Sequence, residues 1–144
     1  MHVALTIYLF SLTVSNWTLG SSVVSVERMF EGASSFTGKG VGSWNVAKLK
    51  TTYYLLYHTA AFDENLNEWN TANVRNMGYT FYLATKFNQN LSKWQTGKVS
   101  NMQGMFQSAS NFDRDISNWD MTKVSITESM VSEVLYLFQL SPLI

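Results

Sequence analysis

The side chains with the clearest capacity for chemistry are three polar triplets that recur every 25 residues. Each follows a phenylalanine: Asp63-Glu64-Asn65, Asn88-Gln89-Asn90 and Asp113-Arg114-Asp115. Oxygen atoms at alternate positions suit Ca²⁺, and a pair such as Asp113 and Asp115 can in principle transfer protons. The same residue types also cap tight turns and form hydrogen-bond ladders when stacked. Because the second triplet is uncharged and Arg114 interrupts the third, we interpret all three as turn caps and expect no metal or other cofactor.

Basic side chains recur four and six residues after successive tryptophans. These positions, the basic ridge, are Lys48, Lys50, Asn73, Arg75, Lys98 and Lys123, and they hold half of the ten lysines and arginines. If the repeats stack, the ridge runs along one edge, away from the acidic side chains that gather before the tryptophans. A ridge of about four charges can bind an anionic glycan or an acidic protein. The alternative is a solvated edge that only keeps the protein soluble.

Other chemistry finds little support in the composition. Cysteine is absent and only His2 and His58 could act as imidazole bases. No glycine-rich loop follows a strand to hold phosphate, and neither histidine belongs to a metal-ligand pattern. The formal net charge is zero, which gives no general affinity for nucleic acid. We therefore expect a protein that is not an enzyme and does not bind nucleic acid.

The elements that position these side chains repeat with the same period. Tryptophans stand at 17, 44, 69, 94 and 119, each preceded by a phenylalanine and by a branched aliphatic residue. The phenylalanines are at 10, 36, 62, 87 and 112, and the aliphatic residues at 14, 41, 66, 91 and 116. Stacked repeats would place equivalent residues about 4.8 Å apart, which suits offset stacking of aromatic rings. The sequence therefore predicts a spine of Trp, Phe and Val/Ile/Leu columns.

A second pattern follows each tryptophan. Val74, Met77, Phe81 and Ala84 are spaced by 3, 4 and 3, and the next repeat keeps that spacing. Such spacing predicts one face of a short helix of about 10 residues. The Phe–Ile–Trp segment predicts extended or turn-rich chain with a short strand. The expected fold class is an α/β repeat solenoid, with a short helix and a short parallel strand or turn in each 25-residue repeat.

The repeat unit resembles a known family. The clearest copy is "VSNMQGMFQSASNFDRDISNWD", from Val99 to Asp120. This unit resembles the repeat of BspA-like leucine-rich-repeat surface proteins, and more closely that of mycoplasma lipoproteins. The resemblance covers roughly residues 23–130. It implies a leucine-rich-repeat-like right-handed coil stack on the cell surface or outside the cell, and it carries over no catalytic residue.

The whole chain, 1–144, is expected to form a single repeat array of about five coils. Residues 1–22 and 131–144 are expected to be degenerate terminal coils, because the pattern weakens there. The apolar start, "MHVALTIYLFSLTV", resembles a signal peptide without its positive region and is too short to span a bilayer. Phe10, Val14 and Trp17 are in register, which favours a coil. The apolar ends could associate end to end, and we expect no membrane span.

The expected function is recognition or adhesion. A cell-surface or secreted module of this kind would bind a protein or glycan partner through its variable polar columns. The alternative is a structural fragment of a longer repeat array that has no ligand of its own. A third hypothesis, a solenoid enzyme, needs acids that converge at one coil, whereas the acids here repeat along the chain.

Overall fold

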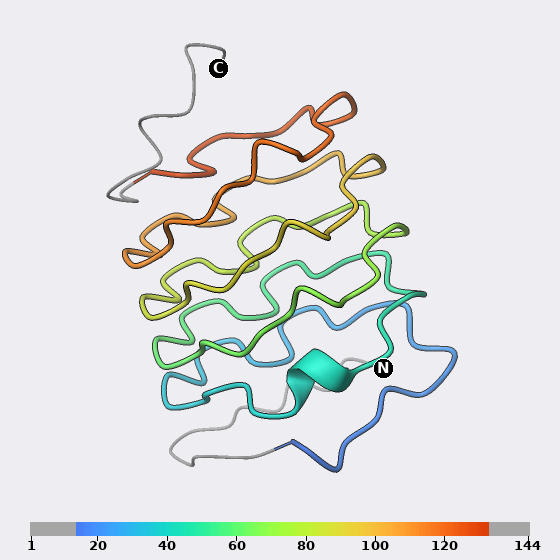
Figure 1. The fold of residues 1–144 in the computed structure, drawn as a ribbon. Coiled ribbons are helices and arrows are strands. Elements are labelled where there is room, and N and C mark those ends of the chain that lie inside the picture. Colours follow the sequence, from blue (N-terminus) through green and yellow to red (C-terminus); the bar gives the residue numbers. More distant parts are fainter. Residues whose placement is uncertain (1–13, 133–144) are drawn as a thin grey trace.

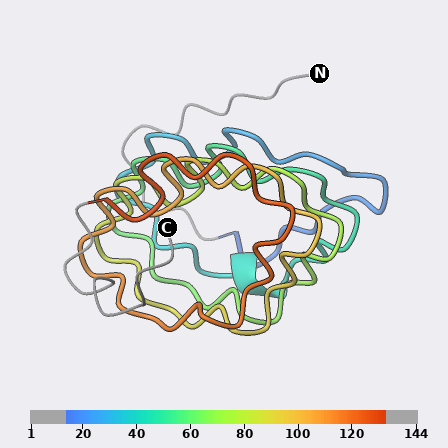
Figure 2. The same cartoon turned by 90° about the horizontal axis from the view of Figure 1, so that it is seen from above.

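The computed structural model describes residues 14–132, which pass five times round the same path (Figure 1). Parallel bridges join Ser25 to Thr51, Thr51 to Asn76, Asn76 to Asn101 and Asn101 to Ile126. Seen from above, the passes lie over one another as a stack of coils (Figure 2). The sequence period therefore corresponds to one coil. Most of the residues assigned to terminal coils, 1–13 and 133–144, lie outside the described range.

The expected fold class, an α/β solenoid like a leucine-rich repeat, is wrong. The only helix within residues 14–132 is the three-residue 3₁₀ helix η1, Val41–Ser43. The same range contains isolated bridges but no strand and no sheet. These residues instead form turns joined by irregular segments, and the segment where we expected a helix contains turns over residues 78–83.

Hydrogen bonds in that segment explain why the spacing misled. Thr80 N–H donates to Met77 O and Ala84 N–H to Phe81 O, so that each closes a four-residue turn. Phe81 N–H lies between them and donates 2.9 Å to Met105 O of the next coil. Backbone donors thus alternate between a turn and the neighbouring coil, whereas an α-helix would send each one four residues back. Consecutive turns also return side chains to one face every three or four residues, which imitates a helical pattern.

Left-handed backbone makes these turns. One position in each coil has φ between 55° and 57°: Arg28, Tyr54, Tyr79, Gly104 and Ser129. A second position, four residues later, has φ between 56° and 74°: Gly32, His58, Leu83 and Ser108. A positive φ at the third residue of a turn defines type II geometry. It also interrupts an α-helix, whose residues all have negative φ.

The core consists of aromatic columns that run through the stack. Trp94 lies between Trp69 and Trp119, with ring centroids 6.1 and 6.3 Å apart and planes within 5° of parallel. Phe87 lies 5.9 Å from Phe62 and 5.8 Å from Phe112. The predicted stacking of equivalent rings is therefore present. All six rings are at least 95% buried.

The indole N–H groups also link the coils. Trp69 donates to Val41 O at 3.1 Å, Trp94 to Leu66 O at 2.8 Å and Trp119 to Leu91 O at 3.2 Å. A buried N–H donor without a partner destabilises a fold. The hydrogen bond to the neighbouring coil therefore allows tryptophan to occupy this buried column. Trp44 is the exception, because its buried Nε1 has no partner. The segment between Phe36 and Trp44 contains one residue more than the equivalent segment of the later coils.

Candidate functional site

The basic ridge is formed as two parallel columns on the outside of the stack. Lys48, Asn73, Lys98 and Lys123 are equivalent in successive coils, and Lys50 and Arg75 form the second column. The five cations are exposed and Asn73 is half-buried. All six predicted residues are therefore brought together along one edge.

Backbone hydrogen bonds hold the second column in register. Arg75 N–H donates to Lys50 O at 2.8 Å, and Ser100 N–H donates to Arg75 O at 2.8 Å. In the first column, Lys98 Nζ donates to Asn73 Oδ1 at 3.0 Å. Asn73 Nδ2 in turn donates to Ala47 O at 2.9 Å. The spacing of the cations along the ridge is thus fixed by the main chain and not by their flexible side chains.

The ridge cations make no salt bridge in the described part of the chain, although the charge of Lys123 adds to the Thr122 hydrogen bonds that lower the pKa of Asp120. Residues 14–132 contain two salt bridges, Arg28–Glu31 at 2.9 Å and Lys93–Glu68 at 2.5 Å, and neither involves the ridge. Like charges one coil apart repel, but the repulsion is modest at an exposed edge in water. Apart from Lys123, which acts on Asp120, the ridge is therefore a row of positive charge without a contacting acid within residues 14–132, and such a row attracts polyanions.

The three polar triplets are turn caps, as predicted. Asp63 Oδ1 accepts from Asn88 N–H at 3.0 Å, and Asn88 Oδ1 accepts from Asp113 N–H at 3.1 Å. These bonds form a ladder between coils. The third members cap turns within their own coils: Asn65, Asn90 and Asp115 each accept from the N–H two residues on, at 2.8 to 2.9 Å. These five side-chain oxygens, which were considered for Ca²⁺, are thus engaged by backbone N–H groups. Within residues 14–132 no group of three His, Cys, Asp or Glu could hold a metal ion.

Two aspartates that cap turns, Asp115 of the third triplet and Asp120 after Trp119, predict that stability depends on pH. Hydrogen bonds from the Ser117 backbone and hydroxyl lower the pKa of Asp115, and bonds from the Thr122 hydroxyl and backbone lower the pKa of Asp120. A carboxylate whose pKa is lowered by folding contributes stability above its unfolded value, and that contribution is lost as pH falls through the folded value. The unfolded value is about 3.9.

We expect the double substitution Asp115→Asn, Asp120→Asn to remove this part of the dependence. The melting temperature of the wild type should fall more steeply below about pH 4 than that of the variant, whereas the two should agree near pH 7. Asparagine is a matched replacement because Asn90 and Asn70 occupy the equivalent positions and cap the same turns. Thermal unfolding followed by circular dichroism from pH 7 to pH 2.5 measures the difference. Parallel curves would show that the caps do not respond to protonation.

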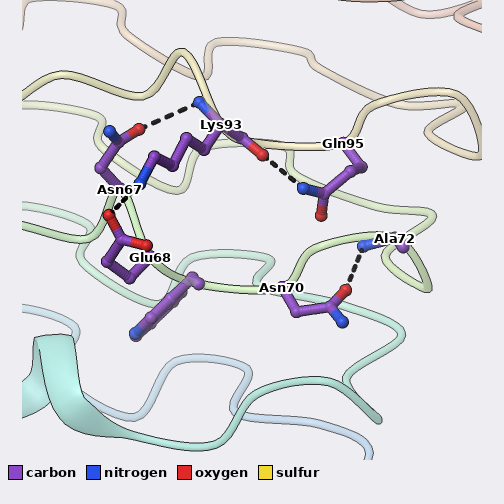
Figure 3. A pocket seen from close by; sticks show the side chains of 7 residues that line it. Asn67, Glu68, Asn70, Ala72, Lys93 and Gln95 are labelled. Atoms are coloured by element: carbon purple, nitrogen blue, oxygen red, sulfur yellow. Dashed lines mark hydrogen bonds and ion pairs between the residues drawn. The ribbon is translucent and has the colours of Figure 1, made fainter.

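A hollow of about 320 Å³ opens beside Trp69, between its coil and the next (Figure 3). It is lined by Asn67, Glu68, Trp69, Asn70, Ala72, Lys93 and Gln95. The polar groups satisfy one another: Lys93 Nζ donates to Glu68 at 2.5 Å, Lys93 N–H to Asn67 Oδ1 at 3.0 Å, and Gln95 Nε2 to Lys93 O. The hollow presents no unpaired charge and no arrangement of nucleophile and base.

Reasoning from the sequence missed this hollow, although it left a signal. Gln95 stands at the position held by Asn45, Asn70 and Asp120 in the other coils. The three short side chains cap their own turns, accepting from the N–H two residues on at 2.9 to 3.2 Å. The longer Gln95 side chain instead reaches back to Thr71, whose N–H donates to Gln95 Oε1 at 3.0 Å. A departure from a repeating residue type is thus a sign of altered local structure.

The structure of residues 14–132 defines a class of protein. They form a repeat protein made of stacked turns, with an aromatic core and with polar and charged columns outside. The chain belongs to the family described as "Mycoplasma protein of unknown function, DUF285", whose model matches residues 7–69 and 24–139. This match supports the mycoplasma-type resemblance of the repeat, while the name BspA-like is not part of it. Neither a curated protein nor a solved structure gives a match.

Between residues 14 and 132 the structure contains no helix with the length and apolar character needed to cross a bilayer.

Proposed function

We propose that this protein is a non-catalytic recognition or adhesion module that binds an anionic partner along the basic ridge. The observation that carries the proposal is the row of five cations on two columns, none of them in a salt bridge within residues 14–132. Solvent-exposed ion pairs are common where surface charges serve only solubility, and they contribute little to stability. The five cations of the ridge have the same sign and are held in register by backbone hydrogen bonds. A negatively charged binding partner explains this arrangement better than solubility does.

The partner is an anionic glycan or an acidic protein, and its place is the cell surface or the exterior of the cell. The location is supported by the resemblance of the repeat to BspA-like surface proteins and mycoplasma lipoproteins. An enzymatic role has less support, because Asp115, one of the two carboxylates that could transfer protons, serves as a turn cap.

The test is a binding measurement with heparin and poly-glutamate as anionic probes and dextran as a neutral one. We expect the triple reversal Lys48→Glu, Lys98→Glu, Lys123→Glu to weaken binding to the anionic probes by more than about tenfold. Each reversal changes the interaction energy with the probe by up to about 1 kcal/mol at the dielectric constant of water. Three reversals are therefore sufficient for a tenfold loss of affinity. Affinity of the wild type should also fall with added salt, because the ridge charges are exposed.

The matched control reverses three exposed cations outside the ridge, Lys39, Lys86 and Arg114. It changes the net charge by the same amount, so it should retain most of the affinity if the ridge is the site. Equal losses in the two variants would mean that the probes respond to net charge and not to the ridge. If a folded wild type binds none of the anionic probes, the alternative of a structural part of a longer array is favoured.

A further inference from the structure

Five of the seven tyrosines of the chain gather on two adjacent coils. Their rings form one connected group, in which neighbouring ring centroids are 4.5 to 6.1 Å apart. Among these five rings two pairs are stacked, one is tilted and three meet edge to face. All five side chains are half-buried, so each ring keeps part of its surface in contact with solvent. We call this group the tyrosine cluster: Tyr53, Tyr54 and Tyr57 from one coil, and Tyr79 and Tyr82 from the next.

Two pairs of the cluster join equivalent positions of the two coils. The rings of Tyr57 and Tyr82 are 4.7 Å apart, centroid to centroid, with planes 4° from parallel. The rings of Tyr54 and Tyr79 are 4.8 Å apart, with planes at 36°. The two members of each pair are 25 residues apart in the sequence. A covalent bond between them would therefore close a loop of one whole coil.

The two pairs differ in the room that their rings have to turn. Tyr54 is enclosed by neighbouring tyrosine rings, and the Arg28 guanidinium lies 4.2 Å from its ring centre. Tyr57 and Tyr82 lie at the margin of the cluster. Apart from each other, the first is next to the Tyr54 ring and the second is next to the Tyr79 ring. A bond between ring carbons requires two stacked rings to turn edge to edge, and the pair at the margin can do so with less disturbance of its neighbours.

Oxidation of tyrosine offers a covalent link between coils that this chain cannot make with cysteine, which is absent. A phenol that loses one electron and its hydroxyl proton becomes a radical. The unpaired electron is shared between the phenol oxygen and the Cε ring carbons, so that two such radicals can join through Cε. Burial, followed by the neighbouring Tyr82, raises the pKa of Tyr57. The phenol is therefore protonated at neutral pH, and its proton leaves together with the electron.

We propose that Tyr57 and Tyr82 form a site of oxidative cross-linking, at which a haem peroxidase acting as one-electron oxidant joins two adjacent coils. Two successive one-electron oxidations convert both phenols to radicals, and each hydroxyl proton passes to water. The radicals couple by forming one Cε–Cε bond, and the hydrogens on these two carbons then move as protons to the phenol oxygens. Overall the protein loses two hydrogen atoms, and the peroxidase reduces one hydrogen peroxide to two water molecules.

The arrangement of the cluster favours coupling within one molecule. The two rings are held side by side at 4.7 Å, and reacting groups positioned in this way react as if at a concentration far above that of any protein solution. A radical formed on another ring of the cluster can reach this pair by electron transfer, because neighbouring centroids are at most 6.1 Å apart. The proposal does not depend on what the basic ridge binds, since the ridge uses other positions of the coil.

The experiment treats the whole protein with a plant haem peroxidase and limiting hydrogen peroxide. We expect the blue fluorescence of a linked pair of phenols and a monomer whose mass is lower by two hydrogens. Proteolysis and mass spectrometry should identify a peptide pair joined at Tyr57 and Tyr82. The yield per molecule should not change when the protein is diluted tenfold, because the reaction is intramolecular. Since a closed loop of 25 residues restricts the unfolded chain, the linked protein should melt roughly 5–15 °C higher.

Two variants test the choice of the pair. Tyr82→Phe keeps the stacked ring but lacks the hydroxyl group, and we expect it to lower the yield of the intramolecular link at least tenfold. Tyr53→Phe is the matched control, because its ring meets its neighbours edge to face, and it should keep most of the yield. The peptide map of the wild type decides the matter independently if a variant does not fold. A link at another pair, links between molecules only, equal yields in the two variants, or no link at all would each overturn the proposal.

Discussion

Substitution of Trp94 by alanine is expected to lower the free energy of unfolding by roughly 3–5 kcal/mol. The indole is 97% buried, stacks on Trp69 and Trp119, and donates to Leu66 O at 2.8 Å. Alanine would leave a cavity in the centre of the column and an acceptor without its donor. Chemical denaturation followed by fluorescence and by circular dichroism measures the change. The effect should reach the coils of both neighbouring tryptophans, because each loses a stacking partner.

Trp17→Ala is the matched control for this prediction. Trp17 is 42% exposed and belongs to the same sequence column. Its substitution should cost less than about 1 kcal/mol, as is usual at the surface. If the two substitutions cost the same, the stacked column would not be the main support of the core.

Gly104→Ala should destabilise the protein by about 1–3 kcal/mol. Gly104 has φ 55°, a left-handed conformation that penalises a Cβ atom. The added methyl would also lie 2.5 Å from the Tyr79 ring, which would have to shift against the neighbouring tyrosine rings. The midpoint and slope of urea denaturation report the loss. A neutral result would mean that the Tyr79 ring can shift without cost.

Introducing glycine at the second left-handed position should change stability in the opposite direction, that is, stabilise the protein. His58 has φ 57° and is exposed, while glycine stands at the equivalent position of the preceding coil, Gly32. His58→Gly is expected to raise stability by up to about 1 kcal/mol through relief of the backbone penalty. His58→Ala is the control, since it removes the imidazole and keeps the Cβ atom. If alanine stabilises as much as glycine, the imidazole and not the backbone is the cause.

The sequence was sufficient to predict the columns and their caps. Trp69, Trp94 and Trp119 recur at an exact interval of 25 residues, and an exact interval requires equivalent residues to meet when the coils stack. Asp63, Asn88 and Asp113 share one offset from the tryptophans, and their short side chains favour turns. Both features depend only on residue type and spacing. The same information placed the six residues of the basic ridge along one edge.

The local backbone could not be predicted in the same way. Spacings of 3, 4 and 3 arise from a helix and equally from consecutive type II turns. The deciding feature is left-handed backbone at Tyr54, Tyr79 and Leu83, residue types that seldom adopt it outside such a context. Hydrogen bonds to the next coil and packed rings hold these residues there, and both involve partners about 25 residues away in the sequence. Contacts between tyrosines of adjacent coils, such as Tyr57 and Tyr82, were not predicted for a related reason: residues 49–59 looked like a departure from the repeat.

The bonds between coils have a mechanical consequence for the proposed adhesion role. Backbone N–H groups donate from one coil to the next, along the axis of the stack, and the first and last described coils (blue and red in Figure 1) lie at its opposite ends. A pulling force between those ends therefore opens the bonds of an end coil one after another, and does not shear all coils at once. Each released coil of 25 residues adds about 80–90 Å of extended chain. Under load, such a stack lengthens in steps while the remaining coils keep their polar and charged columns intact.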